Sequence, residues 1–213
     1  MKEPMNTSNF TSVENTFCCE IERQFPVNIP YLVVANFPKL GLLTALRFLE
    51  WVSDNPEGVI SLPTGKTPEY FIFWTKHILD NWDTSEGKKL RHENGLMIEK
   101  KPVLSGLRFV QIDEFYPISS SQHNSFYHYV KKYYIKDFGL DESKGLFINC
   151  DAIPLADGKY FAEVFPNGIV DLSLMYREAK TIKEKIQQTS ILMLDDWCTN
   201  YEQKIREMGG IGF

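Results

Sequence analysis

The 213-residue sequence lacks the patterns that identify several kinds of ligand site. Its four cysteines show no C-x-x-C spacing, and its four histidines include no H-E-x-x-H pair. His123 and His128 lie five residues apart, off a common helix face, so the usual zinc motifs are excluded. We therefore expect no metal ion and no other cofactor, and reduced thiols at the cysteines.

Long apolar runs and an excess of positive charge are also missing. The longest nearly apolar stretch, residues 31–37, is far too short to span a membrane, and no apolar segment of a signal peptide precedes Cys18. The chain has 23 Lys and Arg against 28 Asp and Glu, a net charge of −5, which argues against nucleic acid as a partner. We expect a cytoplasmic protein that binds neither membranes nor nucleic acid.

The chain is long enough for one sizeable core, and apolar runs alternate with helical patterns along it. Residues 1–28 are rich in Asn, Thr and Ser and predict a mobile arm or an added cap, whereas residues 29–213 predict one α/β domain. The expected strands are residues 58–62, 107–112 and 144–150. The expected helices are residues 38–52, 68–79, 125–135, 172–188 and about 194–208. This alternation predicts an open, mainly parallel sheet with helices on both faces, and surface excursions at 80–106 and 155–189.

The stretch "SLPTGKTPEYF" contains the end of a P-loop pattern but not its beginning. A P-loop needs a glycine at the position of Ile60, and its helix follows the Ser or Thr directly, whereas here Pro68 comes next. Proline fits the first position of a helix, which predicts Thr67 as the N-cap of a helix beginning at Pro68. ATP binding through a P-loop is therefore excluded.

The turn between this strand and helix, called the 64–67 turn below, consists of Thr64, Gly65, Lys66 and Thr67. A strand–turn–helix junction leaves several backbone N–H groups unpaired at the positive end of a helix dipole. Such a junction can seat a phosphate or a carboxylate. An ordinary βα turn without a ligand remains the alternative on this stretch alone.

Two adjacent carboxylates, Asp113 and Glu114, follow the expected strand 107–112. Ligands of open α/β sheets bind beyond the carboxyl ends of the strands, where the 64–67 turn should also lie. A carboxylate near a bound sugar phosphate suits a base that moves a proton between adjacent carbons. Since adjacent strand residues point to opposite faces, only one of the pair can face the ligand, and capping of a turn or helix is the alternative for Asp113.

The segments "LPTGKTP", "IDEFYP", "HNSFYHYV" and "YEQKIREMGGIGF" occur in this order, and together they resemble the glucosamine-6-phosphate deaminase family. The resemblance spans about residues 31–213, and the wider group includes 6-phosphogluconolactonases. Deaminases carry an aromatic residue after D-E where lactonases usually carry arginine, so Phe115 favours the deaminases. The resemblance implies a metal-free aldose–ketose isomerisation with loss of ammonia, acting on a sugar phosphate.

The resemblance also implies roles for single residues. Asp113 matches the enolisation base, which moves a proton between C2 and C1 of the opened sugar, with Glu114 beside it as the second candidate and a structural hydrogen-bond acceptor. The 64–67 turn matches the substrate cradle, where Lys66 replaces a small residue and could either bind the phosphate or obstruct the cradle. Family members continue beyond the segment 210–213 with a G-x-D-G-H loop that opens the sugar ring. This sequence contains no such loop, so it resembles an N-terminal portion, and we expect no deaminase turnover from these 213 residues alone.

Two other functions stay open at this point. One is a sugar-phosphate lactonase of the same fold, which would hydrolyse a lactone and release no ammonia. The other is a non-catalytic module that binds or senses a sugar phosphate. The sequence leaves the sugar undetermined, and a homo-oligomer is compatible with it.

Overall fold

The computed structural model describes residues 10–17 and 31–213 and contains a parallel sheet in the order β1-β2-β3. Its strands are β1 Val59–Leu62, β2 Arg108–Gln111 and β3 Gly145–Leu146. The last residues of the chain extend the sheet on the free side of β1. The Gly212 N–H donates to the Val59 carbonyl at 2.8 Å, and the Ser61 N–H donates to the Phe213 carbonyl at 2.9 Å. These contacts confirm the predicted α/β fold with a mainly parallel sheet.

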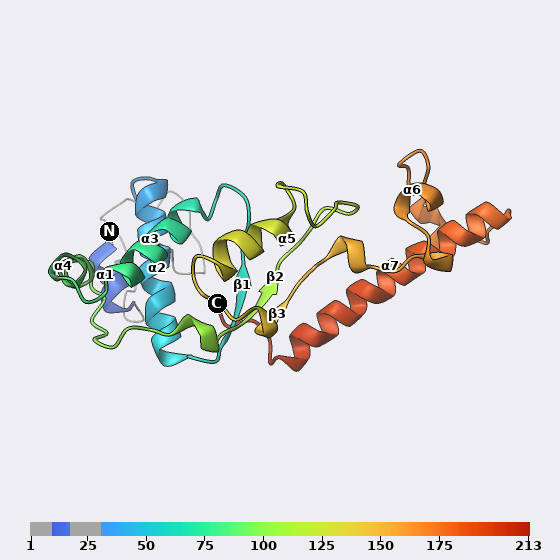
Figure 1. Cartoon of the computed structure of the whole chain (residues 1–213). Helices are drawn as coiled ribbons and strands as arrows, with labels where there is room; N and C mark the ends of the chain where they lie inside the picture. Colours follow the sequence, from blue (N-terminus) through green and yellow to red (C-terminus); the bar gives the residue numbers. More distant parts are fainter. Residues whose placement is uncertain (1–9, 18–30) are drawn as a thin grey trace, which may run out of the picture.

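Helices occupy most of the remaining described chain (Figure 1). The α-helices are α1 Ser12–Phe17, α2 Phe37–Asp54, α3 Glu69–Asp80, α4 Ser85–Glu93, α5 Phe126–Tyr129, α6 Phe161–Val164 and α7 Ile182–Glu207. The 3₁₀ helices are η1 Leu104–Gly106, η3 Glu142–Lys144, η4 Cys150–Ala152, η5 Ala156–Gly158 and η6 Leu172–Met175, and η2 Val130–Ile135 is a π-helix that continues α5.

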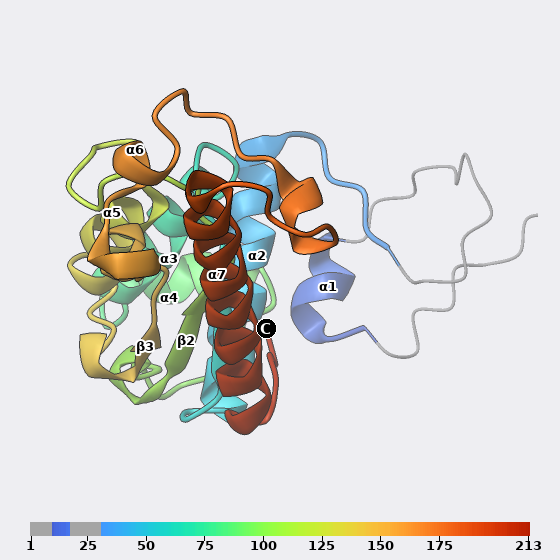
Figure 2. The same ribbon diagram turned by 90° about the vertical axis from the view of Figure 1, so that its right-hand side faces the viewer.

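The main core lies between the sheet and the pair α2–α3. Ile60 and Phe109 from the strands belong to one buried cluster with Leu46 and Ile78 from the two helices. The helices approach each other closely at Gly41, where a Cβ atom would lie 2.3 Å from the Cβ of Tyr70, so only glycine fits there. Helix α7 lies on the other side of the sheet and reaches away from it, with α6 near its far end (Figures 1 and 2).

The N-terminal segment was predicted as an arm or cap, and only residues 10–17 of it are described; the rest, and with it Cys18 and Cys19, lies outside the described residues. Helix α1 packs against α2 with buried Val13 and Phe17, and Glu14 forms an ion pair with Arg47 at 3.1 Å. The Ser12 hydroxyl donates to the Gly95 carbonyl at 2.6 Å. The described part of the segment therefore covers the core, while the domain boundary at residue 28 stays a prediction.

The prediction of two helices at 172–188 and 194–208 was wrong, because one helix, α7, runs from Ile182 to Glu207. Its N-cap is Thr181, whose side chain accepts the Glu184 N–H at 3.1 Å, so the helix begins there. No glycine or proline interrupts residues 182–207, which explains why the helix continues without a break. The third strand is also shorter than the predicted 144–150.

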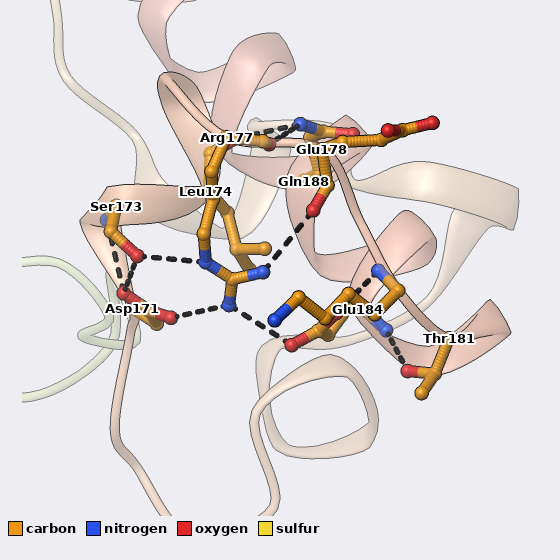
Figure 3. A network of polar contacts seen from close by, with 9 residues as sticks. Asp171, Ser173, Leu174, Arg177, Glu178, Thr181, Glu184 and Gln188 are labelled. Atoms are coloured by element: carbon orange, nitrogen blue, oxygen red, sulfur yellow. Dashed lines mark hydrogen bonds and ion pairs between the residues drawn. The ribbon is translucent and has the colours of Figure 1, made fainter.

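A second, smaller core joins α6, η6 and the first half of α7; we call it the distal cluster. It consists of buried Leu155, Val164, Phe165, Leu174 and Ile191. Beside it, Arg177 binds four partners (Figure 3): its guanidinium donates to Asp171 at 2.8 Å, to Glu184 at 2.9 Å, to the Ser173 hydroxyl at 3.0 Å and to the Glu178 carbonyl at 3.3 Å. The Ser173 hydroxyl and Arg177 lower the pKa of Asp171, and Arg177 lowers the pKa of Glu184. These contacts tie the segment before α7 to the helix.

Acid is therefore expected to loosen this segment. A carboxylate whose pKa is lower in the folded state than in the unfolded state stabilises the folded state. This contribution is complete at pH values above the unfolded-state pKa, about 4, and is lost as the pH falls from there through the folded-state pKa. We predict that the Ser173 and Lys180 N–H groups, which donate to Asp171 and Glu184, exchange faster at pH 3 than at pH 6 after correction for intrinsic rates. In Arg177→Met, exchange at pH 6 should approach that of the parent at pH 3. Equal protection of the parent at both pH values would contradict this prediction.

Candidate functional site

The two predicted parts of the site leave the sheet at the same edge. In the ladder between β1 and β2, Leu62 lies opposite Gln111, where both strands end. The 64–67 turn begins two residues after Leu62, and Asp113 follows Gln111 by the same number of residues. The parallel register therefore brings the turn and Asp113 to the carboxyl edge of neighbouring strands, the usual location of ligands in such sheets.

The 64–67 turn has a backbone suited to holding an anion. Gly65 has a φ of +82°, which glycine adopts freely, and open space surrounds the position of a Cβ atom there. Among the hydrogen bonds between described residues, none has a backbone N–H of residues 64–67 as its donor. Helix α3 follows, so these N–H groups, which have no acceptor among the described residues, lie at the positive end of its dipole.

The prediction that Thr67 caps this helix was wrong. The N-cap is Pro68, with φ −83° and ψ 4°, and no side chain accepts a hydrogen bond at this helix end. The reason is a tight turn before the helix, closed by the Glu69 N–H donating to the Lys66 carbonyl at 3.3 Å, so that helical geometry starts at Glu69. The Thr67 hydroxyl is thereby left available for a ligand.

Two cavities lie beside the turn. A cleft of about 840 Å³ between α3 and the α5–η2 segment is lined by Gly65 and Lys66 together with His77, His123 and Tyr129. The exposed Lys66 side chain lies at this cleft, so the turn carries one positive charge toward it. A smaller apolar cavity of about 170 Å³ is lined by the turn's own Thr67 and by aromatic side chains; these are Phe37, Phe48, Phe71, Phe138 and Phe213. Asp113 lines neither of these two cavities.

Asp113 is exposed, and its backbone is held in place by a buried amide side chain. Gln111, only 1% exposed, donates from Nε2 to the Asp113 carbonyl at 2.9 Å and accepts the Ile148 N–H at 3.1 Å. The Tyr201 hydroxyl from α7 lies 2.7 Å from the Gln111 carbonyl and 2.9 Å from that of Leu146. These contacts fix the ends of β2 and β3, while no described side chain bonds the Asp113 carboxylate. Among the described residues, that carboxylate therefore has no hydrogen-bond or ion-pair partner.

Glu114 has the opposite surroundings. Its carboxylate accepts hydrogen bonds from the Ser125 hydroxyl at 2.8 Å, the Phe126 N–H at 3.1 Å and the Tyr127 N–H at 2.8 Å. A further bond comes from the Phe115 N–H at 3.0 Å. The carboxylate thus satisfies the free N–H groups at the start of α5, where negative charge is favourable. This is the geometry of a structural acceptor, and the alternative catalytic role of Glu114 stays an untested prediction.

Three residues that position the site were missed at the level of sequence: Gln111, Tyr134 and Tyr201. The Tyr134 hydroxyl, fully buried, donates to the Pro63 carbonyl at 2.7 Å, directly before the 64–67 turn. A polar residue at the end of an apolar strand was the only signal for Gln111. The two tyrosines looked like ordinary members of apolar helix faces.

The described residues show no group of three His, Cys, Asp or Glu side chains arranged to hold a metal ion. Cys150 is buried with its thiol 3.7 Å from the Phe115 carbonyl, and burial raises the pKa of this thiol. Cys198 is exposed on α7. Within residues 10–17 and 31–213, no helix combines the length and the apolar character that crossing a membrane requires.

Comparison with known proteins identifies the fold. No protein-family model matches the sequence, and no curated protein matches it. Among solved structures, the chain is similar to a monomeric glucosamine-6-phosphate deaminase of the NagB superfamily, with a TM-score of 0.51 and 16% identity over 83% of this chain. It spans 49% of the deaminase's length. At this identity the likeness is one of fold, and the protein has the α/β fold seen in that deaminase.

Proposed function

We propose that the chain carries part of a site that binds an amino-sugar phosphate. The reaction proposed for this site is an aldose–ketose isomerisation with release of ammonia. One observation supports this most: the 64–67 turn with its free N–H groups and the unbonded Asp113 carboxylate leave neighbouring strands at one edge. The fold shared with a glucosamine-6-phosphate deaminase agrees with it.

In this proposal the turn holds the phosphate or an adjacent anionic group, and Asp113 is the base. Its carboxylate takes the proton from C2 of the open-chain sugar. The C2–H electron pair forms the C1=C2 bond, the C1 carbonyl pair moves to its oxygen, and that oxygen takes a proton from solvent to give the enol. The same carboxyl group then returns the proton to C1. Subsequent loss of the nitrogen from C2 as ammonia, with water supplying the oxygen, leaves fructose 6-phosphate. Glu114 keeps α5 in place during this exchange.

Three expectations from the sequence remain predictions within this proposal. These are the cytoplasmic location, the downstream ring-opening loop and the absence of ammonia release from these 213 residues alone. A lactonase of the same fold is the second candidate, and Phe115 after Asp113-Glu114 disfavours it. A sugar-phosphate-binding module without catalysis is the third. Because we expect no ammonia release from these 213 residues alone, hydrolysis of 6-phosphogluconolactone by the chain is the result that would favour the lactonase, and ammonia release from glucosamine 6-phosphate would contradict that prediction and favour the deaminase.

Binding at the turn is the direct test. On titration with inorganic phosphate or glucosamine 6-phosphate, we expect the largest amide chemical-shift changes in NMR spectra at Gly65, Lys66 and Thr67. Lys66→Ala should weaken binding by about two- to fivefold, since one nearby charge adds to the backbone donors. Lys89→Ala, an exposed lysine on α4, should leave the affinity unchanged. Shift changes confined to other regions would show that the turn is an ordinary βα connection.

A further inference from the structure

Tyr134 connects the π-helix η2 to the beginning of the 64–67 turn. Its side chain is 0% exposed, and its ring packs against Phe138 and Tyr129 with centroid distances of 5.2 and 6.3 Å. Its hydroxyl donates to the Pro63 carbonyl at 2.7 Å, across 71 positions of sequence. Burial raises the pKa of Tyr134, so the hydroxyl keeps its proton and remains a donor at any physiological pH.

The location of this hydrogen bond allows it to orient the backbone at the beginning of the turn. Strand β1 ends at Leu62, so the Pro63 carbonyl lies outside the ladder with β2, and the tyrosine hydroxyl is its protein partner. The peptide unit between Pro63 and Thr64 is planar. Fixing the direction of the Pro63 carbonyl therefore also fixes the direction of the Thr64 N–H, the first free donor of the turn.

We propose that Tyr134 is a positioning residue for anion binding by the 64–67 turn. This inference rests on the proposed function, because it assigns Tyr134 to the same phosphate-holding turn. The hydroxyl acts before the ligand arrives, by holding the Thr64 N–H and the following donors in the orientation that a phosphate requires. Because the turn is already ordered, less conformational entropy is lost when the ligand binds, and the affinity is higher.

The Tyr134→Phe variant tests the inference without disturbing the core. It keeps the buried ring, and the exposed Pro63 leaves room for water to bond the freed carbonyl. We expect inorganic phosphate to bind about five- to tenfold more weakly, the equivalent of one hydrogen bond. In the ligand-free variant, ¹⁵N relaxation should show larger motion at Thr64 and Gly65 than in the parent.

Ser190→Ala is the matched control. It also removes a buried hydroxyl that bonds the backbone, since Ser190 accepts the Ala156 N–H at 3.1 Å, but this residue lies next to Ile191 of the distal cluster and not at the turn. It should leave phosphate affinity and the motion of the turn unchanged, and an equal weakening in this control would overturn the inference. If the parent binds phosphate at the turn and Tyr134→Phe binds it equally well, only the inference fails. If the parent shows no phosphate response at the turn, the proposed function fails and the inference with it.

Discussion

Replacing Asp113 by Asn is expected to slow the exchange of carbon-bound protons of the bound sugar phosphate by about 10²–10⁴-fold, the usual contribution of a general base. The change removes the basic oxygen and keeps the shape, so the affinity for phosphate at the turn should stay nearly constant. The measurement is deuterium incorporation at C1 of fructose 6-phosphate in heavy water, followed by NMR. A ketose phosphate is suitable because its open-chain form can be enolised without a separate ring-opening group.

Two variants make this result specific. Asp195→Asn, an exposed carboxylate on α7, should exchange at the parent rate. Glu114→Gln should retain exchange in the molecules that remain folded. Exchange at the parent rate in Asp113→Asn, together with its loss in Glu114→Gln, would show that the two carboxylates have been assigned the wrong way round. A parent chain that binds phosphate but exchanges no proton would favour the non-catalytic binding module.

The strand–turn–helix unit at the site could be predicted from sequence because its signals are local. An apolar run reaches Leu62, Gly65 permits the positive φ, and Pro68 marks the start of the helix region. The error at Thr67 has the same local origin. Thr67 has the side chain of a typical N-cap, but a turn closed by a hydrogen bond to the Lys66 carbonyl moves the helix start by one residue. Residue preferences for the N-cap position do not show that such a turn competes with the cap.

The positioning contacts could not be predicted because they join distant segments. Tyr134 meets Pro63 across 71 positions, and Tyr201 meets Gln111 across 90. Each depends on how a helix packs against a strand end, which apolar periodicity does not specify. The separation of Asp113 from Glu114 was expected from strand alternation, yet β2 ends at Gln111 and the two residues lie beyond it. Their different surroundings arise instead at the start of α5, where the Phe126 and Tyr127 N–H groups donate hydrogen bonds to the Glu114 carboxylate.

This division of roles predicts that removing Glu114 destabilises the fold, whereas removing the neighbouring Asp113 hardly changes its stability. Glu114→Ala removes the acceptor of the Ser125 hydroxyl and of the Phe126 and Tyr127 N–H groups. Hydrogen bonds to a charged group contribute about 1.5–3 kcal/mol each, and water can satisfy part of the freed donors. We therefore expect the free energy of unfolding to fall by about 2–4 kcal/mol. Asp113→Ala, which removes an exposed carboxylate with no described partner, should change it by less than about 0.5 kcal/mol.

Urea unfolding of the two single variants and the parent measures this contrast directly. The slope of the free energy against urea should stay the same, so that midpoints compare stabilities. Glu114→Gln provides an intermediate case, because its amide keeps one acceptor oxygen but turns the other into a donor facing N–H groups. We expect its loss of stability to lie between those of Asp113→Ala and Glu114→Ala. If Asp113→Ala is the more destabilised variant, the carboxylate assigned to chemistry is instead structural, and the proposal for the base must be abandoned.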